Sequence, residues 1–127
     1  MNEKVDNLIN DIVHSIYSIK GIMKGKIMFY AIYEEDSLAY ALFSRMDPKD
    51  KIVSHNVNSA IVDNCFELNS VMSRESMDWY LFVLKIENLK FNVEFKYLNN
   101  KILSINEKVL RNELLESYFG DSLVKYL

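Results

Sequence analysis

A regular alternation of apolar and polar residues ends the stretch 79–97, WYLFVLKIENLKFNVEFKY. In its second half the apolar residues are Phe91, Val93, Phe95 and Tyr97, and the residues between them are Asn92, Glu94 and Lys96. A period of two is typical of a strand with one buried face. The first half is nearly all apolar, and residues 88–90 separate the halves as a turn. Residues 79–97 therefore predict a β-hairpin of two long strands.

A second hairpin is predicted upstream. Residues 26–33, KIMFYAIY, and 38–46, LAYALFSRM, are rich in aromatic and β-branched residues, which favour strands. The four polar residues 34–37 between them suit a hairpin loop. Residues 47–50, DPKD, form the strongest turn signal in the chain. Residues 51–58 fit either a short edge strand or a loop.

Three helices complete the pattern. The first has apolar residues three and four apart and ends near Gly21 and Gly25; its stripe is Val5, Leu8, Ile9, Ile12, Val13, Ile16 and Ile19. A rougher stripe predicts a second helix over about 58–72. The third starts near Asn106, a suitable N-cap, and ends at Gly120. Its expected buried residues are Val109, Leu110, Leu114, Leu115 and Tyr118. Residues 121–127 add a short terminal turn.

These elements give the order α-β-β-α-β-β-α, an α+β fold in a single domain over residues 1–127. Two hairpins join most simply into a four-stranded antiparallel sheet, or a five-stranded one if residues 51–58 add a strand. We expect the helices to cover one face. The other face would then expose aromatic residues such as Tyr30, Tyr40 or Tyr80, which leaves a homodimer open.

Composition narrows the classes of function. The net charge of −3 is unlike the basic stripe that binding a nucleic-acid backbone requires, so no nucleic-acid partner is expected. The single cysteine, Cys65, cannot form an internal disulfide, which favours a reducing cytoplasm. The N-terminus lacks the pattern of a signal peptide, and no apolar run approaches the ~20 residues of a membrane helix. We therefore expect a cytoplasmic protein without a membrane partner.

The chain carries no recognisable catalytic motif. Its two histidines, His14 and His55, and Cys65 are not spaced as zinc ligands, so neither a metal nor another cofactor is predicted. His14 lies beside the stripe of the first helix. His55 lies in the ambiguous segment 51–58, where both a surface and a catalytic position stay open, and Cys65 falls on an apolar helix stripe as a small core residue. No catalytic residue is assigned, and a non-enzyme is expected.

Acidic residues cluster at two places. Glu34, Glu35 and Asp36 lie at the tip of the first predicted hairpin. A second group comprises Asp63, Glu67, Glu75 and Asp78, with Arg74 as the only cation among them. A solvated surface accounts for both clusters, but an acidic patch that faces a basic partner is the functional alternative, because charge complementarity increases association rate and specificity.

The pattern resembles the YezG-like bacterial immunity or antitoxin proteins. The similarity lies in Trp79 opening a strand, in the alternating segment 91–97, FNVEFKY, and in a last helix that ends with Tyr118, Phe119 and Gly120. It covers most of the chain as an order of elements, although residues 47–58 have no counterpart in it.

This resemblance implies a small cytoplasmic protein that binds and neutralises one cognate toxin domain without catalysis. A basic toxin such as a nuclease would suit the seven acids of the two clusters, which become the candidate contact residues. The alternative is a small acidic chaperone for a secreted effector, which would bind an extended partner. An enzyme is the third class and would need His55 or a carboxylate pair in a pocket.

Overall fold

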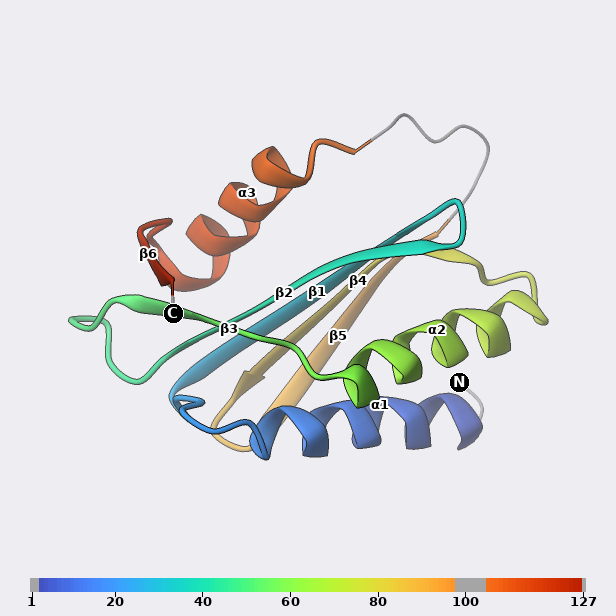
Figure 1. Cartoon of the computed structure of the whole chain (residues 1–127), viewed down its shortest axis with the longest axis horizontal. Coiled ribbons are helices and arrows are strands. Elements are labelled where there is room, and N and C mark those ends of the chain that lie inside the picture. Colours follow the sequence, from blue (N-terminus) through green and yellow to red (C-terminus); the bar gives the residue numbers. More distant parts are fainter. Residues whose placement is uncertain (1–2, 98–104, 127) are drawn as a thin grey trace.

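The computed structural model describes residues 3–97 and 105–126 and has an α+β fold. Within these residues the elements are α1 (Glu3–Tyr17), β1 (Lys26–Glu34), β2 (Ser37–Arg45), β3 (Ile52–His55), α2 (Ser59–Ser73), β4 (Trp79–Glu87), β5 (Lys90–Tyr97), α3 (Glu107–Phe119) and β6 (Val124–Tyr126) (Figure 1). The ambiguous segment 51–58 therefore contains a short strand. The break expected at residues 99–101 lies outside the described residues.

The sheet is larger than the sequence predicted. Its six strands lie in the order β5-β4-β1-β2-β3-β6. The two expected hairpins do join antiparallel, through β1 and β4, but β6 adds a parallel pair with β3 at the far edge. The prediction of a purely antiparallel sheet of four or five strands was wrong. Residues 124–126, expected in a terminal turn, pair with the open edge of β3, and three residues are too few to show a strand period.

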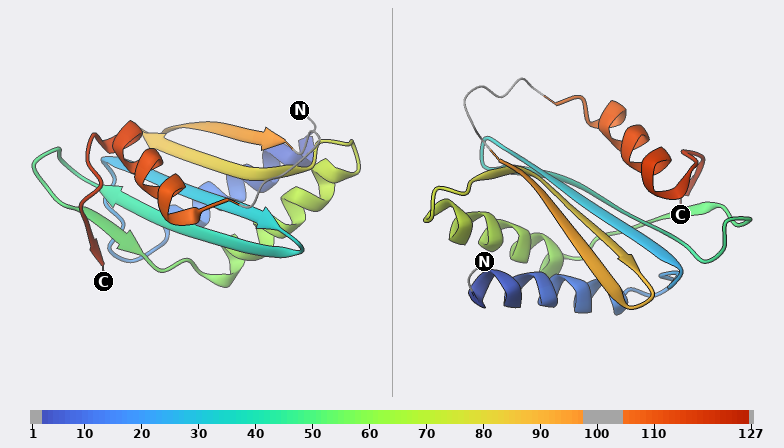
Figure 2. Two further views of the ribbon diagram at one scale, coloured as in Figure 1. Left: turned by 90° about the horizontal axis from the view of Figure 1, so that it is seen from above. Right: turned by 180° about the vertical axis from the view of Figure 1, so that it is seen from behind.

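The helices do not share one face, which corrects a second prediction. α1 and α2 lie side by side on one face, and α3 lies on the other (Figure 2). The reason is visible in β1, which is buried at every position from Ile27 to Ile32. A strand that is apolar on both sides needs cover on both sides. Tyr30, expected on an open face, is fully buried, whereas Tyr40 is exposed and Tyr80 half-buried.

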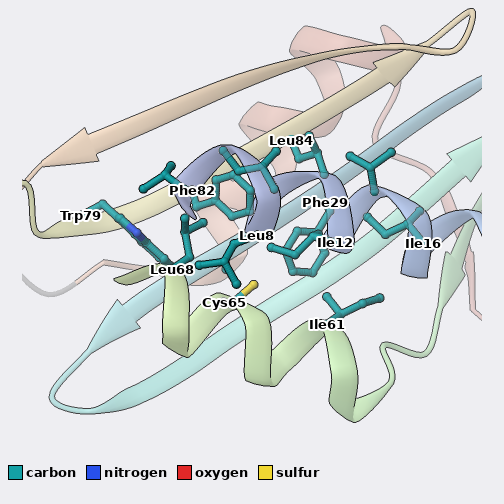
Figure 3. Close-up of a cluster of buried hydrophobic side chains, with 14 of the residues drawn as sticks. Leu8, Ile12, Ile16, Phe29, Ile61, Cys65, Leu68, Trp79, Phe82 and Leu84 are labelled. Atoms are coloured by element: carbon teal, nitrogen blue, oxygen red, sulfur yellow. The ribbon is translucent and has the colours of Figure 1, made fainter. Parts of the chain in front are cut away.

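The larger core lies between the sheet and the α1–α2 pair. Figure 3 shows its side chains, with Leu8, Ile12 and Ile16 of α1 and Leu68 and Cys65 of α2 facing the sheet. The predicted stripe of α1 from Val5 to Ile16 is buried as expected, and Ile19 lies beyond the helix end. Cys65 is fully buried, as its position on the apolar stripe of α2 predicted.

A β-bulge at the start of β4 determines where Trp79 points. Trp79 pairs with Tyr97, but the next pair is Leu81 with Lys96, so β4 advances two residues while β5 advances one. This extra residue reverses the alternation. Trp79 therefore shares the α1–α2 face with Phe82, 5.8 Å away between ring centroids, instead of facing α3 with Leu81.

Helix ends follow the sequence more closely than helix faces do. Asn58 and Asn106 cap α2 and α3 by accepting hydrogen bonds from Ile61 N and Val109 N, as the sequence predicted for Asn106. Gly120 ends α3 with a positive φ of 75°. The predicted stripe of α3 was partly wrong, because Val109 is exposed and Phe119 is buried.

Candidate functional site

Acids from both predicted clusters lie at one end of the molecule. The turn between β1 and β2 and the loop between α2 and β4 lie at the same end of the sheet (Figure 1). Tyr33, at the end of β1, lies between them: its hydroxyl donates a 2.9 Å hydrogen bond to Asp36 Oδ1, and its ring lies 6.1 Å from that of Phe66 on α2. We call this region, comprising Tyr33, Phe66 and the acids of the turn and the loop, the acidic end.

The pKa of Tyr33 reports the local charge. It is raised above its ordinary value, first by the hydrogen bond to Asp36, then by burial and by the negative charges of Asp36 and Asp78. Negative charges close to a phenol disfavour ionisation to phenolate. Asp36 from the turn and Asp78 from the loop thus act on the same hydroxyl, although 42 positions separate them in the sequence.

The other predicted acids join this region unequally. Glu35 and Glu75 are exposed in the turn and the loop, and Asp63 is exposed on α2. Glu67 forms a 3.3 Å ion pair with Lys4 of α1, and Glu34 Oε1 accepts a 3.3 Å hydrogen bond from Ile105 N. Glu67 and Glu34 are thus engaged by α1 and by the segment before α3, whereas Glu35, Asp36, Glu75 and Asp78 lie in the turn and the loop of the acidic end and are the better candidates for contacts with a partner.

The turn itself holds its acids outward. Glu35 and Asp36 have φ values of 48° and 63°, and Glu34 pairs with Ser37 across a two-residue turn. Two residues with positive φ form the tight turn whose twist matches that of a β-hairpin. The two acids therefore lie in a tight two-residue turn where β1 and β2 end.

His55 forms a buried hydrogen bond with Ser44. Ser44 Oγ lies 2.6 Å from His55 Nε2 and accepts a 3.0 Å hydrogen bond from Met23 N. A serine paired with a histidine is a familiar nucleophile and base, but Ser44 is completely buried and has no surface that a substrate could reach. The pair joins β2, β3 and the segment after α1.

A polar cavity of about 430 Å³ lies beside this pair. Tyr40, Ala41, Phe43, Ser54, His55, Asn56, Val57 and Arg111 line it. It forms where β3 ends: β3 pairs only with residues 42–44 of β2, so the outer edge of β2 at residues 37–41 has no strand beside it among the described parts of the chain. The cavity offers hydrogen-bonding groups along an open strand edge.

One polar cluster on the α3 face was not predicted from the sequence. The Tyr30 hydroxyl donates a 2.7 Å hydrogen bond to Glu107 Oε2 and accepts one of 3.0 Å from Arg111 Nε, while Arg111 Nη2 lies 3.2 Å from Glu107 Oε2. Burial raises the pKa of Tyr30 well above its ordinary value. Only the spacing of Glu107 and Arg111 by four, which allows a helical ion pair, could have suggested part of it.

Residues 3–97 and 105–126 contain no group of three or more His, Cys, Asp or Glu residues arranged to hold a metal ion. None of their helices combines the length and apolar character needed to cross a bilayer. No known protein-family model matches the chain, and no curated protein matches it significantly.

Proposed function

We propose that this chain is a non-catalytic binding protein of the immunity type, which neutralises a cognate toxin domain by binding it through the acidic end. The observation that carries the proposal is the convergence of the β1–β2 turn and the α2–β4 loop around Tyr33 and Phe66. Phe66 is 37% exposed, so an aromatic surface lies among carboxylates.

This arrangement matches what a tight, fast protein interface needs. Aromatic side chains supply binding energy at the centre of such interfaces, and charged rims steer association and select the partner. The four acids of the turn and the loop (Glu35, Asp36, Glu75 and Asp78) give this end a negative charge, which favours a basic partner. A nuclease domain, whose own substrate is a polyanion, is the class of toxin that this charge suits.

The test compares two sets of four charge neutralisations. The first variant carries Glu35→Gln, Asp36→Asn, Glu75→Gln and Asp78→Asn, which keep side-chain shape and remove the charge of the acidic end. The matched control carries Asp11→Asn, Asp50→Asn, Glu113→Gln and Glu116→Gln, all at exposed positions elsewhere. Each tagged protein is used to capture partners from its native cytosol, and the captured proteins are identified by mass spectrometry.

We expect the wild type and the control to capture one stoichiometric basic domain, and the acidic-end variant to lose it. When co-expressed with that domain, the wild type and the control should protect cells from its toxicity, and the acidic-end variant should not. Equal capture by both variants would refute the acidic end as the binding surface. A captured domain that is harmless to cells would refute the immunity function itself.

An effector chaperone is the second candidate, because of the open edge of β2. An extended segment of a partner can pair with the open edge of β2 at residues 37–41 as an extra strand, next to the cavity. This function requires an unfolded partner, whereas immunity requires a folded one. If the protein binds the captured partner in its unfolded state and not in its folded state, the chaperone function is favoured.

A further inference from the structure

The outer edge of β5 is a long, open strand edge. β5 ends the sheet, and no described residue pairs with its outer side over Lys90–Tyr97. Proteins usually protect such an edge with a proline, a bulge on the edge strand, charged side chains or a covering segment. β5 contains no proline, and the bulge at this side of the sheet lies in β4. The exposed charges of β5 are of both signs (Lys90, Glu94 and Lys96), so they do not by themselves repel a second copy of the strand. Unpaired backbone groups on a regular edge form a template for another strand.

The apolar face of β5 is also incompletely covered. Phe91 is 42% exposed, and Val93, Phe95 and Tyr97 are only partly buried against the core. A groove of about 530 Å³ runs between β5 and α1, lined by Asp6, Ile9, Asn10, Phe91, Val93 and Phe95. The helix layer therefore stops short of the strand, and the apolar row continues to the edge of the molecule.

We propose that β5 pairs antiparallel with β5 of a second copy, around a two-fold axis that passes through Phe95. In an antiparallel pair, two opposite residues either both point their backbone N–H and C=O groups at the other strand or both point them away. These groups alternate along a strand, so in two identical strands the two-fold axis passes between two copies of the same residue and not between neighbouring residues. An axis through Phe95 places Glu94 opposite Lys96 of the second copy, and the symmetry repeats this charge pair. On the apolar face it places Phe95 beside Phe95 and Val93 beside Tyr97.

Other axes fit this strand less well. An axis through Glu94 brings Glu94 opposite itself, and an axis through Val93 brings Lys90 opposite Lys96; like charges at opposite positions are destabilising. An axis through Asn92 places Lys90 opposite Glu94, but it leaves Phe95 and Tyr97 without partners on the second strand. Only the axis through Phe95 satisfies both the charges and the apolar row.

The resulting assembly continues the sheet from one copy into the other. Both α1 helices then lie on the same face, and the apolar rows of the two β5 strands meet over the groove. The acidic end of each copy depends on β1, α2 and the α2–β4 loop. The inference therefore does not rest on the proposed toxin binding.

Charge exchange across the axis tests this interface. Glu94→Lys and Lys96→Glu alone each create two like-charged pairs, whereas the double variant Glu94→Lys/Lys96→Glu restores two opposite-charged pairs. Sedimentation velocity over a concentration series measures the dimer dissociation constant. We expect each single variant to raise it about tenfold or more and the double variant to restore most of the affinity. Exposed Lys108 and Glu113 on α3 provide the control, with Lys108→Glu and Glu113→Lys leaving the constant unchanged.

Two outcomes would overturn the proposal. A wild-type protein that stays monomeric up to its solubility limit would exclude the interface. Rescue of Glu94→Lys by Lys90→Glu, without rescue by Lys96→Glu, would move the axis to Asn92 and refute the stated register. Glu94 also forms a 3.4 Å ion pair with Lys85 of β4. Glu94→Lys removes this pair in the single and the double variant alike, so recovery of affinity in the double variant reports the charge pair across the axis. Circular dichroism of every variant confirms folding.

Discussion

At the scale of single residues, His55 shows how a titratable group acquires a structural role. Ser44 Oγ accepts a hydrogen bond from Met23 N, so its own proton is available for His55 Nε2. In the neutral imidazole with its proton on Nδ1, His55 Nε2 accepts this proton; in the other tautomer Nε2 donates to Ser44 Oγ. Protonated His55 carries a charge that burial disfavours, and its Nε2 can then only donate to Ser44 Oγ.

This geometry predicts a pH dependence of folding. Burial lowers the pKa of His55 below its ordinary value of 6.5. As the pH falls through about 6.5, the unfolded chain takes up a proton that the folded chain resists, so the free energy of unfolding decreases. This part of the stability is fully present above the unfolded pKa and is lost as the pH falls towards the folded one.

Urea denaturation between about pH 5 and pH 8 checks this prediction. We expect His55→Gln to remove part of the loss of stability on the acid side, because glutamine accepts the same hydrogen bond without titrating. His14→Gln, at an exposed position on α1, is the control. A His55→Gln protein with the same pH dependence as the wild type would contradict the role of His55.

At the scale of elements, α3 is attached to the sheet by polar contacts at both ends. Glu107 and Arg111 in its first turns bind the Tyr30 hydroxyl. At its other end, Lys26 Nζ donates a 3.1 Å hydrogen bond to Tyr118 O, and Arg45 donates to Phe119 O. These carbonyls end the helix without helical partners, where cations are favoured.

The first attachment gives a testable expectation. Tyr30→Phe removes the hydroxyl from Glu107 and Arg111 but keeps the ring in the core. We expect it to lower the free energy of unfolding by about 1.5–3 kcal/mol, the range for hydrogen bonds to charged groups. Hydrogen exchange should accelerate in α3 and not in α1. Tyr40→Phe, which loses an exposed hydroxyl, is the matched control; an equal effect of both substitutions would contradict the attachment.

At the scale of the whole molecule, two cores share one sheet. Phe29 of β1 faces α1 and α2, and its neighbour Tyr30 faces α3. Each central strand therefore contributes side chains to both cores. If the sheet unfolds on one side, the core on its other side is exposed to water as well. We expect the two cores to unfold together as one cooperative unit, in agreement with the prediction of a single domain.

Two probes distinguish cooperative unfolding of the two cores from stepwise unfolding. Trp79, the only tryptophan, lies in the core beside α1 and α2, so its fluorescence reports that face. Hydrogen exchange of α3 in a series of urea concentrations reports the other face. Coincident midpoints are expected. Earlier loss of α3 at a lower urea concentration would show that the α3 core is a separate, weaker unit.

Local signals in the sequence predicted local structure well. The alternation over residues 91–97, the spacing of apolar residues in α1 and the caps Asn106 and Gly120 depend on neighbours within a few residues, and the structure confirms each of them. The acidic turn after β1 follows from the same kind of signal. These features require no knowledge of what packs against them.

By itself, the sequence determined the hairpins, the three helices and the α+β class, because strand and helix periods are properties of contiguous residues. Only the tertiary structure decided that α3 covers the second face, that β6 lies beside β3 and that Asp36 and Asp78 act on one hydroxyl. Those features join residues tens of positions apart. Their free energy comes from burial and pairing across the sheet, which no local pattern encodes.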